Sequence, residues 1–344
     1  ICAFYGSSGA FDGGGPPLYC GSPGVPGGSL EEVLVARPSC RSWVAALSLF
    51  FLTSTACVEG DPVLPGDLRL PIINGTRETG EDAVVFILHE WGGGCTASII
   101  APRVAITARH CVRQNEGDGA LLPFHGYHIL VGANAFFPLD DYGVTDVRST
   151  EGGSIENADF AVMILDRDFT QGTKRWAFTP WPGFTPGARI TAIGYGQTRY
   201  NDPESAGSKY RRDGTVQAIG PVDWMGVPDR EFVSQGENTC QGDSGGPLIY
   251  NDVIVGVVSR GDLGCTGAGL HTRVSSFADM VLAALRDTGA CVPTSLEVCN
   301  GLDDDCYGGP DDGLEGVCAC TGGGSPSEEI CDGVDNDCSG VIDD

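Results

Sequence analysis

Short apolar runs separated by turn-forming residues fill the middle of the chain. AVVFIL (83–88), RVAITA (103–108) and FAVMILD (160–166) are rich in β-branched residues, and the segments between such runs contain Gly, Pro, Asp and Asn. This pattern is typical of β-strands joined by turns. Further segments of the same kind occupy 97–101, 128–133, 188–196, 247–251 and 253–259. The pattern predicts an all-β sandwich or pair of barrels from about residue 72 to residue 273.

A single helical pattern follows the last of these strands. Ser276 is suited to cap the N-terminus of a helix over about 276–288, and Gly289 is suited to end it. The apolar positions on one face are Phe277, Val281, Leu282 and Leu285. Their spacing predicts an amphipathic helix that packs against the β domain and closes it.

The N-terminal part of the chain has a different pattern. Residues 1–36 are rich in Gly, Pro and Ser and lack a hydrophobic period, so we expect them to be disordered or not part of the natural product. Residues 37–57 combine two arginines, an apolar run and small residues up to Cys57, the layout of a secretory signal. Their ending, STAC, resembles a bacterial lipobox, which would place a lipid anchor on Cys57; an ordinary signal peptide fits equally well. Residues 58–71 would then be a propeptide or linker, and the protein would be secreted or held at the surface of a bacterium, for example as an outer-membrane lipoprotein.

The composition excludes several partners and indicates an oxidising compartment. Of the 344 residues, 52 are Gly, 21 are Pro and 15 are Cys, and the net charge is −26. A chain this acidic is not suited to bind nucleic acid or an anionic membrane. Zinc is the alternative use of many cysteines, but only five histidines are present and no C-x-x-C pair occurs, so disulfides are the better interpretation.

The C-terminal segment 290–344 carries two acidic repeats with cysteines. Residues 297–312 align with 329–344, and both resemble the Cys- and Asp-rich metal-binding motifs of secreted myxobacterial proteins. The second repeat resembles the first nine positions of an EF-hand loop and lacks the fourth cysteine of the first, so we expect it to be truncated. Oxygen ligands favour Ca²⁺, and the candidates are Asp303, Asp305 and Asp311 in the first repeat and Asp335, Asp337, Ser339 and Asp343 in the second. An acidic, disulfide-stapled spacer without metal, or a surface-binding module, is the alternative.

The stretch CQGDSGGPL (240–248) places a candidate nucleophile, Ser244, on a glycine-rich turn. A serine hydroxyl needs a base to take its proton and a third group to orient that base. Among the five histidines, His110 in TARHC (107–111) stands at the end of a predicted strand, beside a cysteine. Asp159 directly precedes an apolar strand, where aspartate is otherwise disfavoured. GDSGG also fits the G-x-S-x-G elbow of α/β-hydrolases, but strands follow Ser244 and no βαβ alternation is visible.

These residues resemble the landmarks of the chymotrypsin/trypsin family of serine proteases. IINGT (72–76), TARHC, NADFAVMIL, CQGDSGGPL and GLHTRV (269–274) follow one another in the family's order, over about residues 72–289. The resemblance implies two packed six-stranded antiparallel β-barrels with a C-terminal helix, followed here by a small disulfide-rich acidic tail. It also implies a monomeric secreted serine endopeptidase that acts on protein or peptide substrates without a catalytic cofactor.

The family pattern assigns a role to each candidate residue. Ser244 would attack the peptide carbonyl, His110 would act as general base and then as general acid, and Asp159 would orient the imidazole. The amides of Gly242 and Ser244 would form the oxyanion hole, which binds the negative oxygen of the intermediate. Two disulfides are also implied, Cys95–Cys111 and Cys240–Cys265.

The resemblance further implies that the chain is made as a zymogen. Asp243 would form a buried ion pair with the α-ammonium of Ile72 after an activating protease releases that residue. A buried carboxylate without a partner is unfavourable, so the loop would reorganise only after cleavage. The residue before Ile72 is Pro71 rather than Lys or Arg, so the expected route is a cut after Arg69 followed by trimming.

The substrate pocket departs from that of trypsin-like members. Asn238, followed by Thr239, occupies the position of the usual specificity aspartate, and Ser259, Gly261 and Gly269 would line the pocket walls. A neutral amide cannot pair with a cation as a carboxylate does. We therefore expect a neutral S1 pocket, the pocket for the substrate residue before the cut bond (P1). Substitution by the nearby Glu237 is the alternative, and it would need the loop to shift.

Two unusual arginines leave a second function open. Arg109, next to His110, stands where the family usually has alanine, and Arg260 replaces a tryptophan beside the pocket, where it could favour acidic substrate residues. A catalytically weak homologue that acts as a binding or adhesion protein is therefore the alternative to an active protease, although all three triad residues are present.

Overall fold

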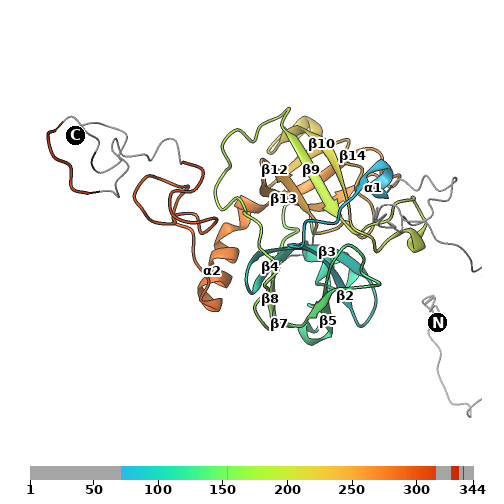
Figure 1. The fold of residues 1–344 in the computed structure, drawn as a ribbon. Coiled ribbons are helices and arrows are strands. Elements are labelled where there is room, and N and C mark those ends of the chain that lie inside the picture. Colours follow the sequence, from blue (N-terminus) through green and yellow to red (C-terminus); the bar gives the residue numbers. More distant parts are fainter. Residues whose placement is uncertain (1–70, 153, 315–326, 333–335, 337–344) are drawn as a thin grey trace, which may run out of the picture. The chain divides into compact units, whose positions relative to one another are not determined.

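The computed structural model describes residues 71–152, 154–314, 327–332 and 336 (Figure 1). These residues comprise the β domain, its helix and the first acidic repeat. The predicted signal sequence with Cys57, and the propeptide apart from Pro71, lie outside them. So do the candidate ligands of the second repeat, which are Asp335, Asp337, Ser339 and Asp343.

The described strands form two antiparallel sheets, drawn as two lobes in Figure 1. The N-terminal sheet has the order β6-β5-β2-β3-β4-β8-β7. Its strands are β2 (Val84–His89), β3 (Gly94–Ala101), β4 (Val104–Thr107), β5 (Tyr127–Val131), β6 (Asp140–Tyr142), β7 (Val144–Ser149) and β8 (Ala161–Leu165). The C-terminal sheet contains β1 (Thr76–Arg77), β9 (Arg189–Gly194), β10 (Tyr210–Ile219), β11 (Glu231–Gln235), β12 (Pro247–Tyr250), β13 (Val253–Gly261) and β14 (Ala268–Arg273).

The C-terminal sheet closes into a barrel, whereas the N-terminal sheet stays open. β10 pairs with both β9 and β11, so six strands form a ring and β1 joins β10 from outside. Among the described residues no pairing joins β6 to β7, so the first sheet is a half-barrel. The prediction of an all-β, trypsin-like fold is confirmed, but the second closed barrel that it included is not formed.

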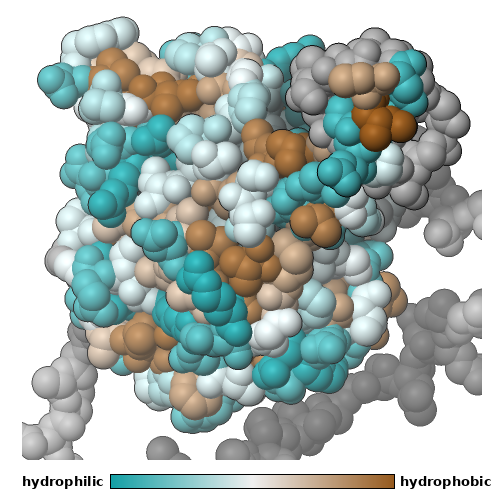
Figure 2. Space-filling model, turned by 90° about the vertical axis from the view of Figure 1, so that its left-hand side faces the viewer, coloured by the Kyte–Doolittle hydropathy of each residue, from teal (hydrophilic) through white to brown (hydrophobic). Residues whose placement is uncertain are grey.

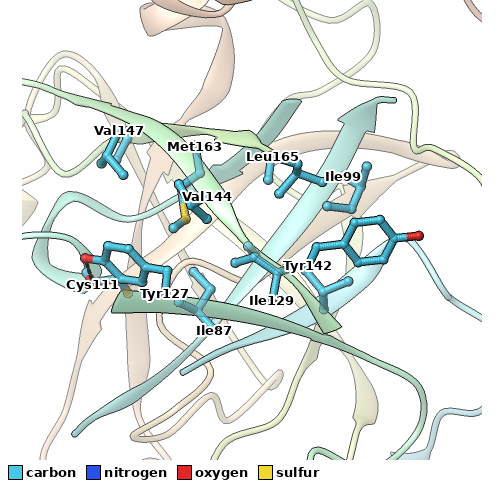
Figure 3. Packing of buried hydrophobic residues seen from close by; sticks show 14 of the residues in the cluster. Ile87, Ile99, Cys111, Tyr127, Ile129, Tyr142, Val144, Val147, Met163 and Leu165 are labelled. Carbon is cyan, nitrogen blue, oxygen red and sulfur yellow. Dashed lines mark hydrogen bonds between the residues drawn. The ribbon is translucent and has the colours of Figure 1, made fainter. Parts of the chain in front are cut away.

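The core of the N-terminal sheet is formed by the apolar side chains of its strands, which are buried either continuously or at alternate positions. All five residues of β8 are buried, whereas β2 alternates more exposed and buried positions in its second half. Side chains from several strands, including Ile87, Ile129 and Met163, meet inside the sheet (Figure 3). Apolar area removed from water stabilises such a core by about 25 cal/mol per Å².

The helix α2 (Ala278–Thr288) packs against the outside of the N-terminal sheet. A short 3₁₀ turn, Val274–Phe277, precedes it, so Phe277 rather than Ser276 occupies the N-cap position and no side chain caps the helix. Phe277 stacks on Phe160 with ring centroids 5.0 Å apart. Gly289 ends the helix at φ 70°, the left-handed conformation that glycine adopts readily, as predicted.

The first acidic repeat follows α2 in the chain and contacts the β domain. Cys291 and Cys306 form a disulfide, and Cys299 is disulfide-bonded as well. The Arg175 guanidinium pairs with the buried carboxylate of Asp305 and lies over the ring of Tyr307. The repeat therefore packs on the β domain.

The surface carries several exposed apolar side chains, among them Trp91, Phe136, Phe137, Trp224 and Leu263. On the face shown in Figure 2, hydrophobic residues form separate groups among hydrophilic ones. Within the described part of the chain, every helix is too short or too polar to span a lipid bilayer.

Candidate active site

Neighbouring strands bring His110 and Asp159 together. His110 lies in the 3₁₀ turn Arg109–Cys111 just after β4, and Asp159 lies just before β8. Because β4 and β8 are paired, with Thr107 opposite Ala161, the two side chains meet at one edge of the sheet. The distance from His110 Nδ1 to Asp159 Oδ2 is 2.8 Å, and the His110 amide donates to Asp159 Oδ1 at 3.0 Å.

Asp159 is held as a buried carboxylate. It is fully buried, and the Ser259 hydroxyl donates to its Oδ2 at 2.6 Å. Burial by itself would raise the pKa of Asp159, but the hydrogen bonds and charge of His110, together with Ser259, outweigh it and hold that pKa below its usual value. The carboxylate can therefore fix the imidazole so that Nδ1 carries the proton and Nε2 is left as the base.

Ser244 lies on the loop between β11 and β12, next to this pair. The Thr96 amide donates to its carbonyl oxygen at 2.8 Å, and Cys111 Sγ is 3.6 Å from the same oxygen. No hydrogen bond joins the Ser244 hydroxyl to His110 in the described residues. Hydrogen bonds between a nucleophile and its base are often long in enzymes without substrate and tighten when substrate binds.

The backbone of the same loop leaves two amides available. Gly242 has φ 100°, and a Cβ there would lie 2.9 Å from the Cα of Gly196, so only glycine fits. The Gly242 carbonyl accepts a hydrogen bond from Thr96 Oγ1 at 2.8 Å. Neither the Gly242 amide nor the Ser244 amide donates to another described residue. Both amides are therefore unpaired within the described residues.

Two disulfides brace the site, in the pairing that the family resemblance implied. Cys95–Cys111 ties the residue after His110 to β3, and Cys240–Cys265 ties the serine loop to the segment between β13 and β14.

Asp243 is fully buried beneath the serine loop. Its carboxylate accepts hydrogen bonds from the amides of Gly196 and Cys240, both at 2.8 Å. Burial raises the pKa of Asp243 to about 7, although these amides act in the opposite direction. No cation pairs with it among the described residues. Ile72 in the short segment α1 (Pro71–Asn74) is also buried and has φ 34°, a strained value for a β-branched residue.

Two cavities lie on either side of the serine loop. One, of about 160 Å³, is lined by Thr239, Ser244, Ser259 and Gly261 among others. The other, of about 420 Å³, is lined by Gly242 together with apolar side chains that include Phe86.

The structure places Asn238 differently from the sequence prediction. Asn238 has φ 52°, and its amide donates to the carbonyl of Ile73 at 3.2 Å. The neighbouring Glu237 is instead buried beside Gly269, the expected pocket wall. The sequence prediction placed Asn238, not Glu237, at the pocket floor. A hint of a different backbone path lies in Gly236 and Asn238, two residue types that tolerate positive φ.

Both unusual arginines are bound within the protein. Arg260 forms a bidentate ion pair with the buried Glu231, at 2.8 and 2.6 Å, so its charge is neutralised and the expected preference for acidic substrate residues loses its basis. Arg109 is fully buried and donates to the carbonyls of Ser154, at 3.0 Å, and of Gly152.

The first repeat gathers three carboxylates, though not the three that the sequence predicted. Oxygens of Glu297, Asp305 and Asp312 lie within 4.8 Å of one another. Asp311 instead accepts hydrogen bonds from the amides of Asn300 and Gly301. Partial burial raises the pKa of Glu297, and the negative charges of Asp303 and Asp312 raise it further. One buried oxygen of Asp312 has no hydrogen-bond partner among the described residues. Three carboxylates in this arrangement are compatible with a metal ion.

Comparison with known proteins identifies the class. A family model described as "Trypsin" matches residues 72–281, more than half of the chain, so the chain belongs to the trypsin family and is a serine endopeptidase of that family. A second model, described as "Putative metal-binding motif", matches residues 290–312 and 326–344.

The chain is similar to proteases of animals and bacteria. Kallikrein-15 of Homo sapiens is 24% identical over 269 residues, which cover 71% of this chain and 99% of the relative. A trypsin-like protease of Streptomyces glaucescens is 28% identical, over 61% of this chain and 81% of its own length. Among solved structures, a scabies mite inactivated protease paralogue, S-D1, has a TM-score of 0.53 at 17% identity, covering 64% of this chain and all of that one. This last likeness concerns the fold alone.

Proposed function

We propose that this protein is a catalytically active endopeptidase that uses His110, Asp159 and Ser244 as its triad. The observation that carries the proposal is the buried Asp159, which binds the His110 imidazole at 2.8 Å beside a serine loop with two free amides. The catalytically weak binding homologue remains the rival, and labelling of Ser244 decides between them.

The proposed reaction follows from the positions of these groups. Ser244 Oγ attacks the peptide carbonyl while His110 Nε2 takes its proton, and the carbonyl oxygen moves to the amides of Gly242 and Ser244. His110 then gives the proton to the leaving amine, which leaves an acyl group on Ser244. Water then attacks the acyl carbonyl while His110 takes its proton. His110 returns that proton to Ser244 Oγ as the bond to the acyl group breaks and the carboxylic acid leaves. Asp159 stays ionised throughout and stabilises the imidazolium.

We further propose that the chain is a zymogen activated by release of Ile72. Asp243 is a buried carboxylate that accepts from two backbone amides and has no cation beside it among the described residues, and an α-ammonium on Ile72 would supply the missing charge. The strained φ of Ile72 supports a change in this segment on cleavage. Because Pro71 precedes Ile72, an activating protease would cut upstream and the remainder would be trimmed.

The setting of the enzyme is proposed on chemical grounds. The disulfides require an oxidising compartment, which fits a secreted or surface-held bacterial protein. The first repeat would hold Ca²⁺ through Glu297, Asp305 and Asp312, as a structural ion distant from the reaction. The ion would neutralise adjacent carboxylates and stiffen the repeat against the domain.

A fluorophosphonate probe tests the catalytic proposal directly. The full chain is treated to release Ile72 and then labelled, with Ser244→Ala and His110→Ala as matched variants. We expect one adduct on Ser244 in the parent and none in either variant, with hydrolysis of a denatured protein substrate following the same order. A folded parent with a free Ile72 that neither labels nor hydrolyses would support the binding homologue instead.

A further inference from the structure

A buried carboxylate of the C-terminal barrel contacts the segment that carries Asp159. Glu231 is the first residue of β11 and is fully buried. Its Oε1 accepts a hydrogen bond from the backbone amide of Asn157, which lies two residues before Asp159 in the chain. The proposed reaction makes no direct use of this carboxylate. Glu231 therefore links the closed barrel to the segment that leads from the N-terminal sheet's aspartate into β8.

The same carboxylate binds an arginine on a strand beside the serine loop. Arg260 on β13 donates to Glu231 Oε1 at 2.8 Å and to Oε2 at 2.6 Å. Arg260 lines the smaller of the two cavities there and directly follows Ser259, whose hydroxyl donates to Asp159 Oδ2. β13 is therefore connected to the Asp159 segment twice, once through Ser259 and once through Glu231. We call the second connection, from Arg260 through Glu231 to Asn157, the carboxylate bridge.

Asn157 is held at both its backbone and its side chain. Its φ is 58°, a left-handed value that asparagine tolerates better than most residues. Its Oδ1 accepts a hydrogen bond from the Arg230 amide at 2.6 Å, while its own amide donates to Glu231. Two consecutive residues of the closed barrel thus fix the backbone just before Asp159. Because only Ala158 stands between Asn157 and Asp159, movement of Asn157 would be passed on to the carboxylate.

The bridge needs a carboxylate rather than a neutral side chain. Glu231 Oε1 accepts from Asn157 and Arg260, and Oε2 accepts from Arg260 alone. A glutamine there would turn its own N–H groups toward the guanidinium or the amide. An apolar pair can often replace a buried ion pair at little cost in stability, but it offers no acceptor to the Asn157 amide. The bridge is therefore suited to fix a position more than to add stability.

We propose that Glu231 is a positioning residue of the reaction and acts through Asp159. By holding Asn157 to β13, it keeps the Asp159 carboxylate opposite His110 Nδ1, at the observed distance of 2.8 Å. This rests on the proposed catalytic function and adds a residue that sets the geometry of the same site. A misplacement of about 1 Å in a positioned group can cost about a hundredfold in rate. The effect of Glu231 should therefore lie below the loss of about 10⁴ expected when Asp159 itself is changed.

Steady-state kinetics of Glu231→Gln test the proposal on the protein with Ile72 released. We expect kcat to fall between about tenfold and a hundredfold, because the Asp159 segment is no longer held. Glu81→Gln is the matched control, since Glu81 is a partly buried glutamate that pairs with Lys174 at 3.2 Å instead, and it should leave kcat within about twofold. A folded Glu231→Gln variant whose kcat falls less than about threefold overturns the proposal.

A double-mutant cycle with Asp159 separates positioning from general damage. In an Asp159→Asn background the group that Glu231 positions is absent, so Glu231→Gln should change kcat by less than about threefold. An equal loss in both backgrounds would show that Glu231 acts independently of Asp159 and would overturn the proposal. If Glu231→Gln does not fold, Glu231→Met combined with Arg260→Met replaces it, because both charges and the acceptor are then removed together. The same loss of kcat and the same dependence on Asp159 are expected of it.

Proton NMR tests the bridge without turnover. In Ser244→Ala with Ile72 released, the His110 Nδ1 proton, which is hydrogen-bonded to Asp159, should resonate far downfield of the backbone amides. We expect Glu231→Gln to shift this resonance upfield or broaden it, and Glu81→Gln to leave it in place. An unchanged resonance overturns the assignment of Glu231 even if the enzyme is active. A changed resonance in a protein that never hydrolyses peptides would leave Glu231 assigned and refute the catalytic proposal.

Discussion

The stability of the uncleaved chain should fall as the pH rises, because of Asp243. In the uncleaved chain this carboxylate is fully buried, no described residue places a cation beside it, and its pKa is raised from the usual 3.8 to about 7. An acid with a raised pKa binds its proton more tightly in the folded state than in the unfolded state. The free energy of unfolding therefore decreases between pH 3.8 and about pH 7, and the loss is complete above that range.

The size of this loss follows from the difference between the two pKa values. About three units correspond to roughly 4 kcal/mol, of which ~2–3 kcal/mol falls between about pH 5 and pH 8. For a domain of this size it corresponds to a change of several degrees in the midpoint of thermal unfolding. Release of Ile72 should remove the loss, because its ammonium would keep Asp243 ionised.

Thermal unfolding of four forms measures the effect without autolysis. Ser244→Ala is prepared uncleaved and with a free Ile72, each with and without Asp243→Asn. Other groups also titrate, so the quantity of interest is the difference between each form and its Asp243→Asn partner. We expect this difference to change by ~2–3 kcal/mol between about pH 5 and pH 8 in the uncleaved form only. The same difference at both pH values in the uncleaved form would refute the reasoning.

Three further predictions concern the triad and the first repeat. Asp159→Asn should lower kcat/KM by about 10⁴ while the protein stays folded, because His110 loses the group that sets its tautomer; a loss below tenfold would contradict the triad. Arg175→Ala leaves the Asp305 carboxylate buried without its partner and should destabilise the domain by about 3–5 kcal/mol, measured by denaturant unfolding; a value under 1 kcal/mol would show that the pair is solvated. Calcium chelation should lower the unfolding midpoint of the parent but not of Glu297→Gln, and equal midpoints with and without calcium in the parent would argue against an ion in the first repeat.

Local sequence patterns predicted the strands that are apolar and missed those that are polar. The runs at 83–88 and 160–166 correspond to β2 and β8 within a residue at each end. β10, with the sequence YRRDGTVQAI, was not predicted, because its first half is polar and none of its first four residues is buried. Barrel closure depends on β10 pairing with both β9 and β11, and no local pattern encodes that.

The candidate site shows the same division. His110 and Asp159 could be found because each stands at the end of an apolar strand. A polar side chain is uncommon at such a position, so its presence indicates a functional or structural role. Glu237 was named only as an alternative to Asn238. Which of two adjacent side chains points into the barrel depends on one backbone angle, φ 52° at Asn238, and sequence alone does not fix it.

The buried Arg109 links the turn that carries His110 to the neighbouring loop, and this limits how either segment can be exchanged. Its guanidinium holds the carbonyls of Gly152 and Ser154, and the loop leads directly to Asp159. If this loop were replaced by one of another length, from a relative with alanine next to its histidine, the Arg109 guanidinium would stay buried without its carbonyl acceptors. Loop and arginine therefore form one structural unit, and a chimera must replace both together to keep His110 and Asp159 in register.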